Sequence, residues 1–247
     1  MCQCFLRLKH LFWYTDGMKR MIARVGEMSP VVRALLVSNL VSVLLFLMRV
    51  IVTQSSVYWF LFWNLFLAWV PVLLVWLLRR SLRTHLWIQP LPVLLTVLWL
   101  GFLPNSFYIM SDLIHLESTG DIGVLYDAVF MLSFIWNGAV AGFLSMIWMH
   151  QEILKRRSAQ FAGAVMTGVI LLTSFAIYLG RSLRWNTWDV LVNPAGLLFD
   201  VTERVINPLT HAQYLTTTGT FFLLIGSMYY VVWVFVQQLS LPTKRRK

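Results

Sequence analysis

Long uninterrupted apolar runs dominate the chain. Six of them reach the roughly 18 residues that a helix needs to cross the hydrocarbon core of a bilayer. They cover residues 32–52, 57–78, 91–110, 124–149, 161–180 and 215–238. A membrane β-barrel would instead show alternating apolar and polar positions. The pattern therefore predicts an all-α fold, a bundle of six transmembrane helices that forms a single domain over residues 32–239.

Composition places the chain outside the soluble class. Hydrophobic residues make up 59% of the sequence and charged residues 12%, whereas a soluble domain carries about 25% charged residues. The only two cysteines, Cys2 and Cys4, precede Met18, which is a second candidate start of translation. Two cysteines at these positions exclude a disulfide framework and a Cys-based zinc site.

The basic residues predict the orientation in the membrane. If the spans alternate, 16 of the 20 Lys and Arg lie on one side, in segment 1–31, at the start of the first span, after the second and fourth spans, and in the tail 240–247. The remaining four are Arg49, Arg181, Arg184 and Arg204. By the positive-inside rule both termini are cytoplasmic, and the protein is a multi-pass protein of the cell membrane.

The formal net charge of +10 has the same explanation. A basic surface can bind nucleic acid, but here the cations follow one side of the membrane and form no patch on a soluble domain. We therefore exclude nucleic acid as a partner. We expect the cations to meet the anionic head groups of membrane lipids at the cytoplasmic face.

The longest loop, residues 181–214, is predicted to lie on the outer side. Within it, residues 195–206 follow Asn193-Pro194 and place apolar side chains at helical spacing among polar ones. This period is typical of a short amphipathic helix in the membrane interface. Its apolar residues are Leu197, Leu198, Val201 and Val205.

Polar residues gather at the outer end of the third span. On a helix with about 100° per residue, Asn105, Tyr108, Asp112 and His115 fall within an arc of about 80°. Ionisable side chains near hydrocarbon usually face a partner or a cavity. The stripe is therefore a candidate site, in which Asn105 and Tyr108 would bind a substrate. The alternative is that Asp112 and His115 merely end the span in the head-group layer.

Asp112 and His115 are three residues apart, so both can reach one ligand from a single helix face. Together with Asp127, at the start of the fourth span, they could act as general acid and base. A carboxylate and an imidazole also suit a divalent metal such as zinc, manganese or iron. In that hypothesis Asp112 and His115 bind the metal, and Asp127 and His211 complete the site.

A second polar cluster follows the fifth span. If the helix continues there, Arg181 and Arg184 share a face and could hold a phosphate or a carboxylate, because guanidinium matches both anions. The alternative is that arginine–aspartate pairs only pin the loop to the bundle. The candidate binding residues of this cluster are Arg181, Arg184, Trp185, Asn186, Trp188 and Asp189.

Three features predict close packing between spans. Gly138 and Gly142 in the fourth span have the small-xxx-small spacing that lets helix backbones approach closely, and so do Ala164 and Gly168 in the fifth. Asn64, inside the second span, is predicted to hydrogen-bond to a neighbouring helix because lipid offers it no partner.

The two polar clusters together resemble an uncharacterised family of bacterial polytopic membrane proteins, a domain of unknown function. Its first motif is matched by Pro104-Asn105, Tyr108-Ile109, Asp112-Leu113 and His115-Leu116, and its second by the six residues of the cluster after the fifth span. An acid early in the fourth span corresponds to Asp127. The chain departs from the pattern at Phe107, where the family prefers proline. The resemblance implies a bacterial cell-membrane protein but brings no established activity.

Three functions follow from these residues. The first is an enzyme that acts on a lipid or lipid-linked anion at the outer leaflet. The second is a small transporter or ion-coupled permease with Asp112, Asp127 and His115 as a relay. The third is a non-catalytic membrane scaffold. No nucleophile or phosphate-loop motif is present to decide whether the protein is an enzyme.

Overall fold

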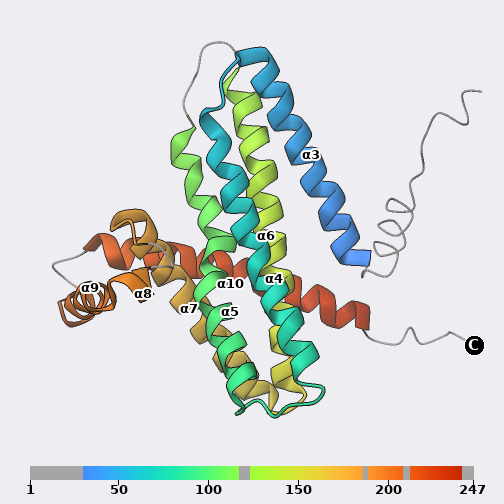
Figure 1. Ribbon diagram of the computed structural model, residues 1–247, viewed down its shortest axis with the longest axis vertical. Coiled ribbons are helices and arrows are strands. Elements are labelled where there is room, and N and C mark those ends of the chain that lie inside the picture. Colours follow the sequence, from blue (N-terminus) through green and yellow to red (C-terminus); the bar gives the residue numbers. More distant parts are fainter. Residues whose placement is uncertain (1–29, 117–122, 186–188, 208–211, 241–247) are drawn as a thin grey trace, which may run out of the picture.

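The structure, a computed structural model (Figure 1), describes residues 30–116, 123–185, 189–207 and 212–240. Every regular element within these residues is a helix. Six are long: α3 (Pro30–Thr53), α4 (Phe60–Ser81), α5 (Pro90–Tyr108), α6 (Val124–Leu154), α7 (Ala159–Ser182) and α10 (Ala212–Ser240). Four are short: η2 (Val57–Trp59), η3 (Ile109–His115), α8 (Asp189–Val192) and α9 (Pro194–Ile206).

Six helices in the described part of the chain are long and apolar enough to cross a membrane, and each contains one of the predicted runs. This confirms the all-α, six-span prediction. The terminal segments 1–29 and 241–247 lie outside the described residues, so the predicted domain limits and orientation remain predictions. So does the metal-ligand role of His211, which is also outside them.

Helix α6 is the centre of the bundle. In its most apolar stretch 72% of the residues are buried, compared with 11% in α10. The main core consists of side chains such as Leu78 from α4, Leu103 and Phe107 from α5, and Ile177 from α7, packed around the face of α6 that carries Phe143. A second core nearer the start of α6 is built around Phe130 and Phe134.

Small residues on α6 allow α5 to pack closely against it. A Cβ added at Gly138 would lie 2.7 Å from Ile109 Cγ2, and one added at Gly142 would lie 2.7 Å from Phe107 Cζ. The predicted close approach is therefore confirmed for the fourth span. In the fifth span the prediction is wrong for Gly168, since a Cβ there would meet nothing within 4 Å among the described atoms. The spacing permits a close approach but does not cause one.

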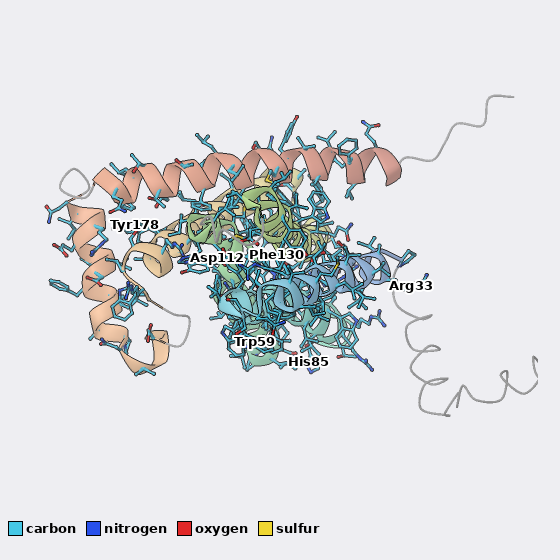
Figure 2. All side chains as sticks on the ribbon, turned by 90° about the horizontal axis from the view of Figure 1, so that it is seen from above. Arg33, Trp59, His85, Asp112, Phe130 and Tyr178 are labelled. Carbon is cyan, nitrogen blue, oxygen red and sulfur yellow. The ribbon has the colours of Figure 1, made fainter. Side chains whose placement is uncertain are left out.

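Helix α10 differs from the arrangement that alternating spans would give. In Figures 1 and 2 it lies across the other long helices and along one side of the bundle. It packs mainly on α7, and Tyr229 on α10 meets His150 on α6, with 2.8 Å between the hydroxyl oxygen and Nδ1. The indole of Trp233 stacks on the same imidazole, with ring centroids 4.0 Å apart. These aromatic contacts hold α10 at the flank of the bundle.

Candidate functional site

The polar stripe lies where the third span changes its helix type. Helix α5 ends at Tyr108, and the chain continues as the 3₁₀ helix η3 through His115. Because a 3₁₀ helix has three residues per turn, side chains three positions apart are eclipsed. Asp112 and His115 therefore lie directly above one another on one face, more closely aligned than α-helical geometry predicts.

Asp112 is buried at this end of the bundle, with 2% of the residue exposed. Its Oδ2 accepts a hydrogen bond of 2.7 Å from Nδ2 of Asn64 on α4. This contact confirms the prediction that Asn64 bonds to a neighbouring element. Sequence reasoning did not place Asn64 in the site, although a strongly polar amide inside a span is the kind of signal that could have done so.

Arg181, in the last turn of α7, completes the site from the other side. Its Nη1 lies 3.6 Å from Oδ1 of Asp112, which is an ion pair but too long for a hydrogen bond. Its Nη2 lies 3.2 Å from Nε2 of His115, and because a guanidinium only donates, this imidazole nitrogen is the acceptor. The guanidinium carbon also lies 5.9 Å from the centre of the Tyr108 ring.

The structure thus brings Tyr108, Asp112 and His115 of the predicted stripe together with Arg181, and we call these four residues the Asp112 cluster. Tyr108 packs against the end of α7, since a Cβ added at Gly180 would lie 3.0 Å from Tyr108 Cε2. The Asn105 amide, which shares the predicted stripe, donates to the carbonyl of Phe102 at 3.1 Å. This hydrogen bond lies within its own helix, α5.

Asp127 belongs to a different pair. Arg49 on α3 donates to it through Nε at 2.7 Å and through Nη2 at 3.3 Å, and both side chains are buried. The Arg49 guanidinium also lies over the ring of Tyr58, at 4.4 Å, and the Tyr58 hydroxyl donates to the His115 carbonyl at 3.2 Å. Arg49 was not predicted as a site residue, but an arginine within a span requires an acidic partner.

The described residues place no third metal ligand beside Asp112 and His115. Among the described residues no group of three or more His, Cys, Asp or Glu is arranged to hold a metal ion, so Asp112, His115 and Asp127 do not form one. The Arg181 guanidinium instead contacts both Asp112 and His115. A cation beside both proposed ligands favours an anion over a metal ion at this place.

The cluster after the fifth span is divided by the end of α7. The helix ends at Ser182, and Arg184 adopts a left-handed backbone with φ of 59°, so the helical face expected for Arg181 and Arg184 does not continue. Arg184 is exposed. Asp189 begins α8, and Asn186 and Trp188 lie outside the described residues.

Trp185 connects this loop to α9. Its indole Nε1 donates to Oδ2 of Asp200 at 2.7 Å, and Nη1 of Arg204 lies 3.1 Å from the other oxygen, Oδ1. The short helix predicted over residues 195–206 is confirmed as α9, whose first turn is capped by the Asn193 side chain accepting from Gly196 N–H at 3.1 Å. Its position in the membrane interface stays a prediction.

The Arg204 guanidinium is buried against α7, where its Nε donates to the Tyr178 hydroxyl at 3.2 Å. Burial lowers the pKa of Arg204, but the Tyr178 hydrogen bond and the charges of Asp200 and Glu203 outweigh it, and the pKa is raised above its ordinary value. Arg204 is therefore a permanent cation that ties α9 to α7. An arginine–aspartate pair therefore pins the loop to the bundle, as the alternative interpretation predicted, and the pair consists of Arg204 and Asp200.

Comparisons with known proteins agree with the resemblance found in the sequence. No curated protein and no solved structure matches the chain. A family model does match it, and the matched region, residues 63–231, contains Asn64, Asp127 and the whole Asp112 cluster but not Arg49. Because the match covers more than half of the chain, the protein belongs to the family described as "Protein of unknown function (DUF1361)".

Proposed function

We propose that this membrane protein binds the phosphate of a lipid or lipid-linked head group at the Asp112 cluster, on the extracytoplasmic face. The observation that carries the proposal is the state of Arg181. Its side chain is 19% exposed, and its ion pair with Asp112 is 3.6 Å long. Its Nη2 contacts the imidazole of the exposed His115, and among the described residues no carboxylate is hydrogen-bonded to this nitrogen.

A phosphate oxygen is a better acceptor for Nη2 than a neutral imidazole nitrogen. Hydrogen bonds between guanidinium and phosphate are charge-assisted and can be bidentate. Asp112 would keep Arg181 in place without consuming its donors, because Asn64 already holds the carboxylate by its other oxygen. His115 would move aside or donate a second hydrogen bond to the ligand.

The surroundings favour a head group that belongs to a lipid. Leu113 and Ile114, on the same 3₁₀ helix as Asp112, are exposed apolar residues, and the cluster lies at the end of a membrane span. A ligand bound here can therefore place its phosphate on Arg181 while its apolar part stays in the bilayer. A free anion would use only the first of these contacts.

We propose binding, and do not extend the proposal to catalysis. Ser106 and Ser111, two hydroxyls that precede His115 in the described part of the chain, donate to the carbonyls of Ala68 and Tyr108, at 3.0 and 2.6 Å. A hydroxyl engaged in this way is not activated by an adjacent base. The relay alternative is weakened for a similar reason, since Asp127 is already paired with Arg49.

The test is a ligand-induced thermal shift of the purified protein in a neutral detergent. Short-chain phosphatidic acid should raise the unfolding temperature of the wild type, and short-chain phosphatidylcholine and inorganic phosphate should do so less. Arg181→Gln should bind phosphatidic acid about tenfold or more weakly, because it removes a charge-assisted hydrogen bond. Arg33→Gln, which removes one exposed cation at the start of α3, should respond like the wild type.

Three results would oppose the proposal. An equal response to phosphatidic acid in Arg181→Gln and wild type would remove Arg181 from the binding site. A lower unfolding temperature of Arg181→Gln, with no ligand response in either protein, would support the scaffold alternative, in which the cluster only clamps α7 to η3. A response of the wild type to inorganic phosphate as large as to phosphatidic acid would assign the site to a soluble anion.

A further inference from the structure

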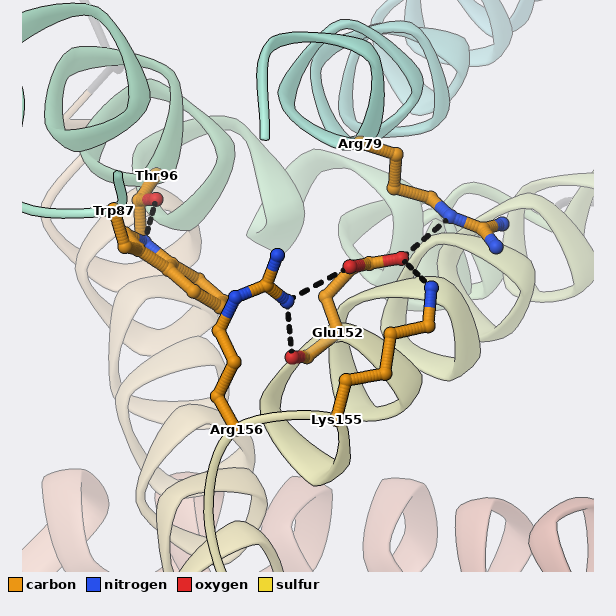
Figure 3. Close-up of polar contacts among 6 residues, drawn as sticks. All are labelled: Arg79, Trp87, Thr96, Glu152, Lys155 and Arg156. Carbon is orange, nitrogen blue, oxygen red and sulfur yellow. Dashed lines mark hydrogen bonds and ion pairs between the residues drawn. The ribbon is translucent and has the colours of Figure 1, made fainter. Parts of the chain in front are cut away.

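A second charged cluster lies on the other half of the bundle, around Glu152 near the end of α6 (Figure 3). Only 4% of the Glu152 side chain is exposed. Its Oε1 accepts from Arg79 Nε at 3.0 Å and from Lys155 Nζ at 2.6 Å, and its Oε2 accepts from Arg156 Nη1 at 2.9 Å. One buried carboxylate thus holds three cations from α4 and from the end of α6.

The positive charge around this cluster exceeds the single negative charge of Glu152. Arg80 and Arg83 lie beside the same groove as Arg79, Lys155 and Arg156, so five cationic residues share one carboxylate there. Like charges gathered at a membrane surface repel one another unless an anion lies between them. Positive charge therefore remains at the groove after the ion pairs with Glu152 have formed.

An apolar groove continues from these cations along α4. The whole groove has a volume of about 1120 Å³, and its apolar walls come from α3, α4 and α6. Figure 1 shows why there is room, since α3 diverges from α4 toward its Pro30 end. Large apolar side chains on α4 are open to the groove, with Leu73 54% and Trp76 46% exposed.

We propose that this groove is a specific binding site for an anionic phospholipid. The head-group phosphate binds between Arg80, Arg83 and Lys155, and an acyl chain lies along α4 past Trp76 and Leu73 toward Phe66. From Arg80 to Phe66 the helix rises about 20 Å. That length exceeds the about 15 Å depth of one hydrocarbon leaflet. The site is separate from the Asp112 cluster, because Asn64 lies near the start of α4 and Arg79 in its last turn.

Aromatic rings beside the cations favour a lipid over a soluble anion. The guanidinium of Arg80 lies 5.7 Å from the centre of the Trp76 ring, and that of Arg79 lies 5.4 Å from the Trp148 ring. Cations and indoles paired in this way are typical of the layer between head groups and acyl chains. A soluble polyanion would bind the cations but would leave the apolar walls uncovered.

The test measures which lipid the purified protein retains. The background protein is Arg181→Gln, which lacks the first site. This protein and variants made in it are incubated in detergent with equal amounts of phosphatidylglycerol and phosphatidylcholine. Native mass spectrometry then gives the ratio of the two bound lipids. The background protein should prefer phosphatidylglycerol, and Arg80→Gln with Arg83→Gln should reduce the preference by about fivefold for each arginine. Neither arginine contributes to the ion pairs of Glu152.

Two further variants sharpen the result. Leu73→Trp narrows the groove and keeps every charge, so it should lose phosphatidylglycerol while its thermal stability stays near that of the background. Arg157→Gln removes a cation that does not line the groove and should change nothing. An unchanged preference in the Arg80, Arg83 double variant would overturn the proposal. A second pair of results would also overturn it: pyrophosphate displaces phosphatidylglycerol from the background protein, and Leu73→Trp binds pyrophosphate as well as the background does. Those results would assign the groove to a soluble anion.

Discussion

Asn64 on α4 donates a hydrogen bond of 2.7 Å to Oδ2 of Asp112, while the other oxygen of the same carboxylate lies 3.6 Å from Arg181 on α7. One buried side chain therefore joins two long helices to the 3₁₀ end of the third span. The short contact is to a neutral amide and the long one is to the cation. This difference leaves Arg181 the donors that the proposed phosphate would use.

We predict that Asn64→Leu lowers stability, because it leaves a buried carboxylate without its closest hydrogen bond. The loss should be about 1.5–3 kcal/mol, as for a hydrogen bond to a charged group. Asn64→Asp should be worse, since two carboxylates would then face each other. Thermal or denaturant unfolding in detergent would measure both.

The exchanged pair Asn64→Asp with Asp112→Asn provides the control. It restores an amide–carboxylate hydrogen bond between α4 and η3 and should recover most of the stability lost in Asn64→Asp. It also moves the charge away from Arg181. Wild-type stability in Asn64→Leu would contradict the role given to this bond.

The buried pair of Arg49 and Asp127 predicts that removing one partner strongly lowers stability and that replacing both recovers much of it. Asp127→Ala leaves a buried, unpaired guanidinium and should cost about 3–5 kcal/mol. Replacing both residues by apolar ones, Arg49→Met with Asp127→Leu, should restore much of that loss. If the double replacement is stable and still responds to phosphatidic acid, Asp127 has a structural role. A stable Asp127→Ala would contradict the importance of the pair.

The contact of α5 with α6 predicts that two similar glycines respond differently to alanine. Gly142→Ala would place a Cβ 2.7 Å from Phe107 Cζ and 2.9 Å from Ser106 Cβ, and such overpacking costs about 1–3 kcal/mol. The added Cβ of Gly168→Ala meets no described atom within 4 Å, and this variant should be neutral or slightly stabilising, because alanine favours a helix. Equal unfolding temperatures of the two variants would argue against the close approach.

The hydrogen bond between Trp185 and Asp200 predicts how α9 is held. Trp185→Phe keeps the aromatic body but removes the donor, so amide hydrogen exchange in α9 should become faster while exchange in α6 stays unchanged. Trp63→Phe, on an exposed face of α4, is a matched control. Unchanged exchange in α9 would show that Arg204 alone holds the helix to α7.

The spans and the polar stripe could be predicted because both depend on local spacing. Apolar runs fix the length of a membrane helix, and the positions of Tyr108, Asp112 and His115 put them on one face of an α-helix. The partners of these residues come from helices far away in sequence. Neither the pairing of Asp127 with Arg49 nor that of Asp112 with Asn64 follows from spacing, since each acid had several candidate partners.

Two further differences concern where a helix ends and how a helix packs. The left-handed conformation of Arg184 ends α7 before the predicted face is complete, and nothing in the residue type announces it, because glycine or asparagine is usual there. The crosswise course of α10 depends on aromatic contacts with α6 and α7. Hydropathy reports that such a helix can cross a membrane but not how it packs.

The placement of the two proposed sites predicts a reporter pattern. If the Asp112 cluster is extracytoplasmic, an alkaline-phosphatase fusion at about residue 119 should be active, and one at about residue 156, next to the cations of the Glu152 groove, should be inactive. A fusion near residue 210 should be active and one at the tail inactive if α10 crosses the membrane. Activity at 156 with none at 119 would reverse the orientation. The Asp112 cluster would then face the cytoplasmic leaflet and the Glu152 groove the outer leaflet. The cations around Glu152 would in that case violate the positive-inside rule.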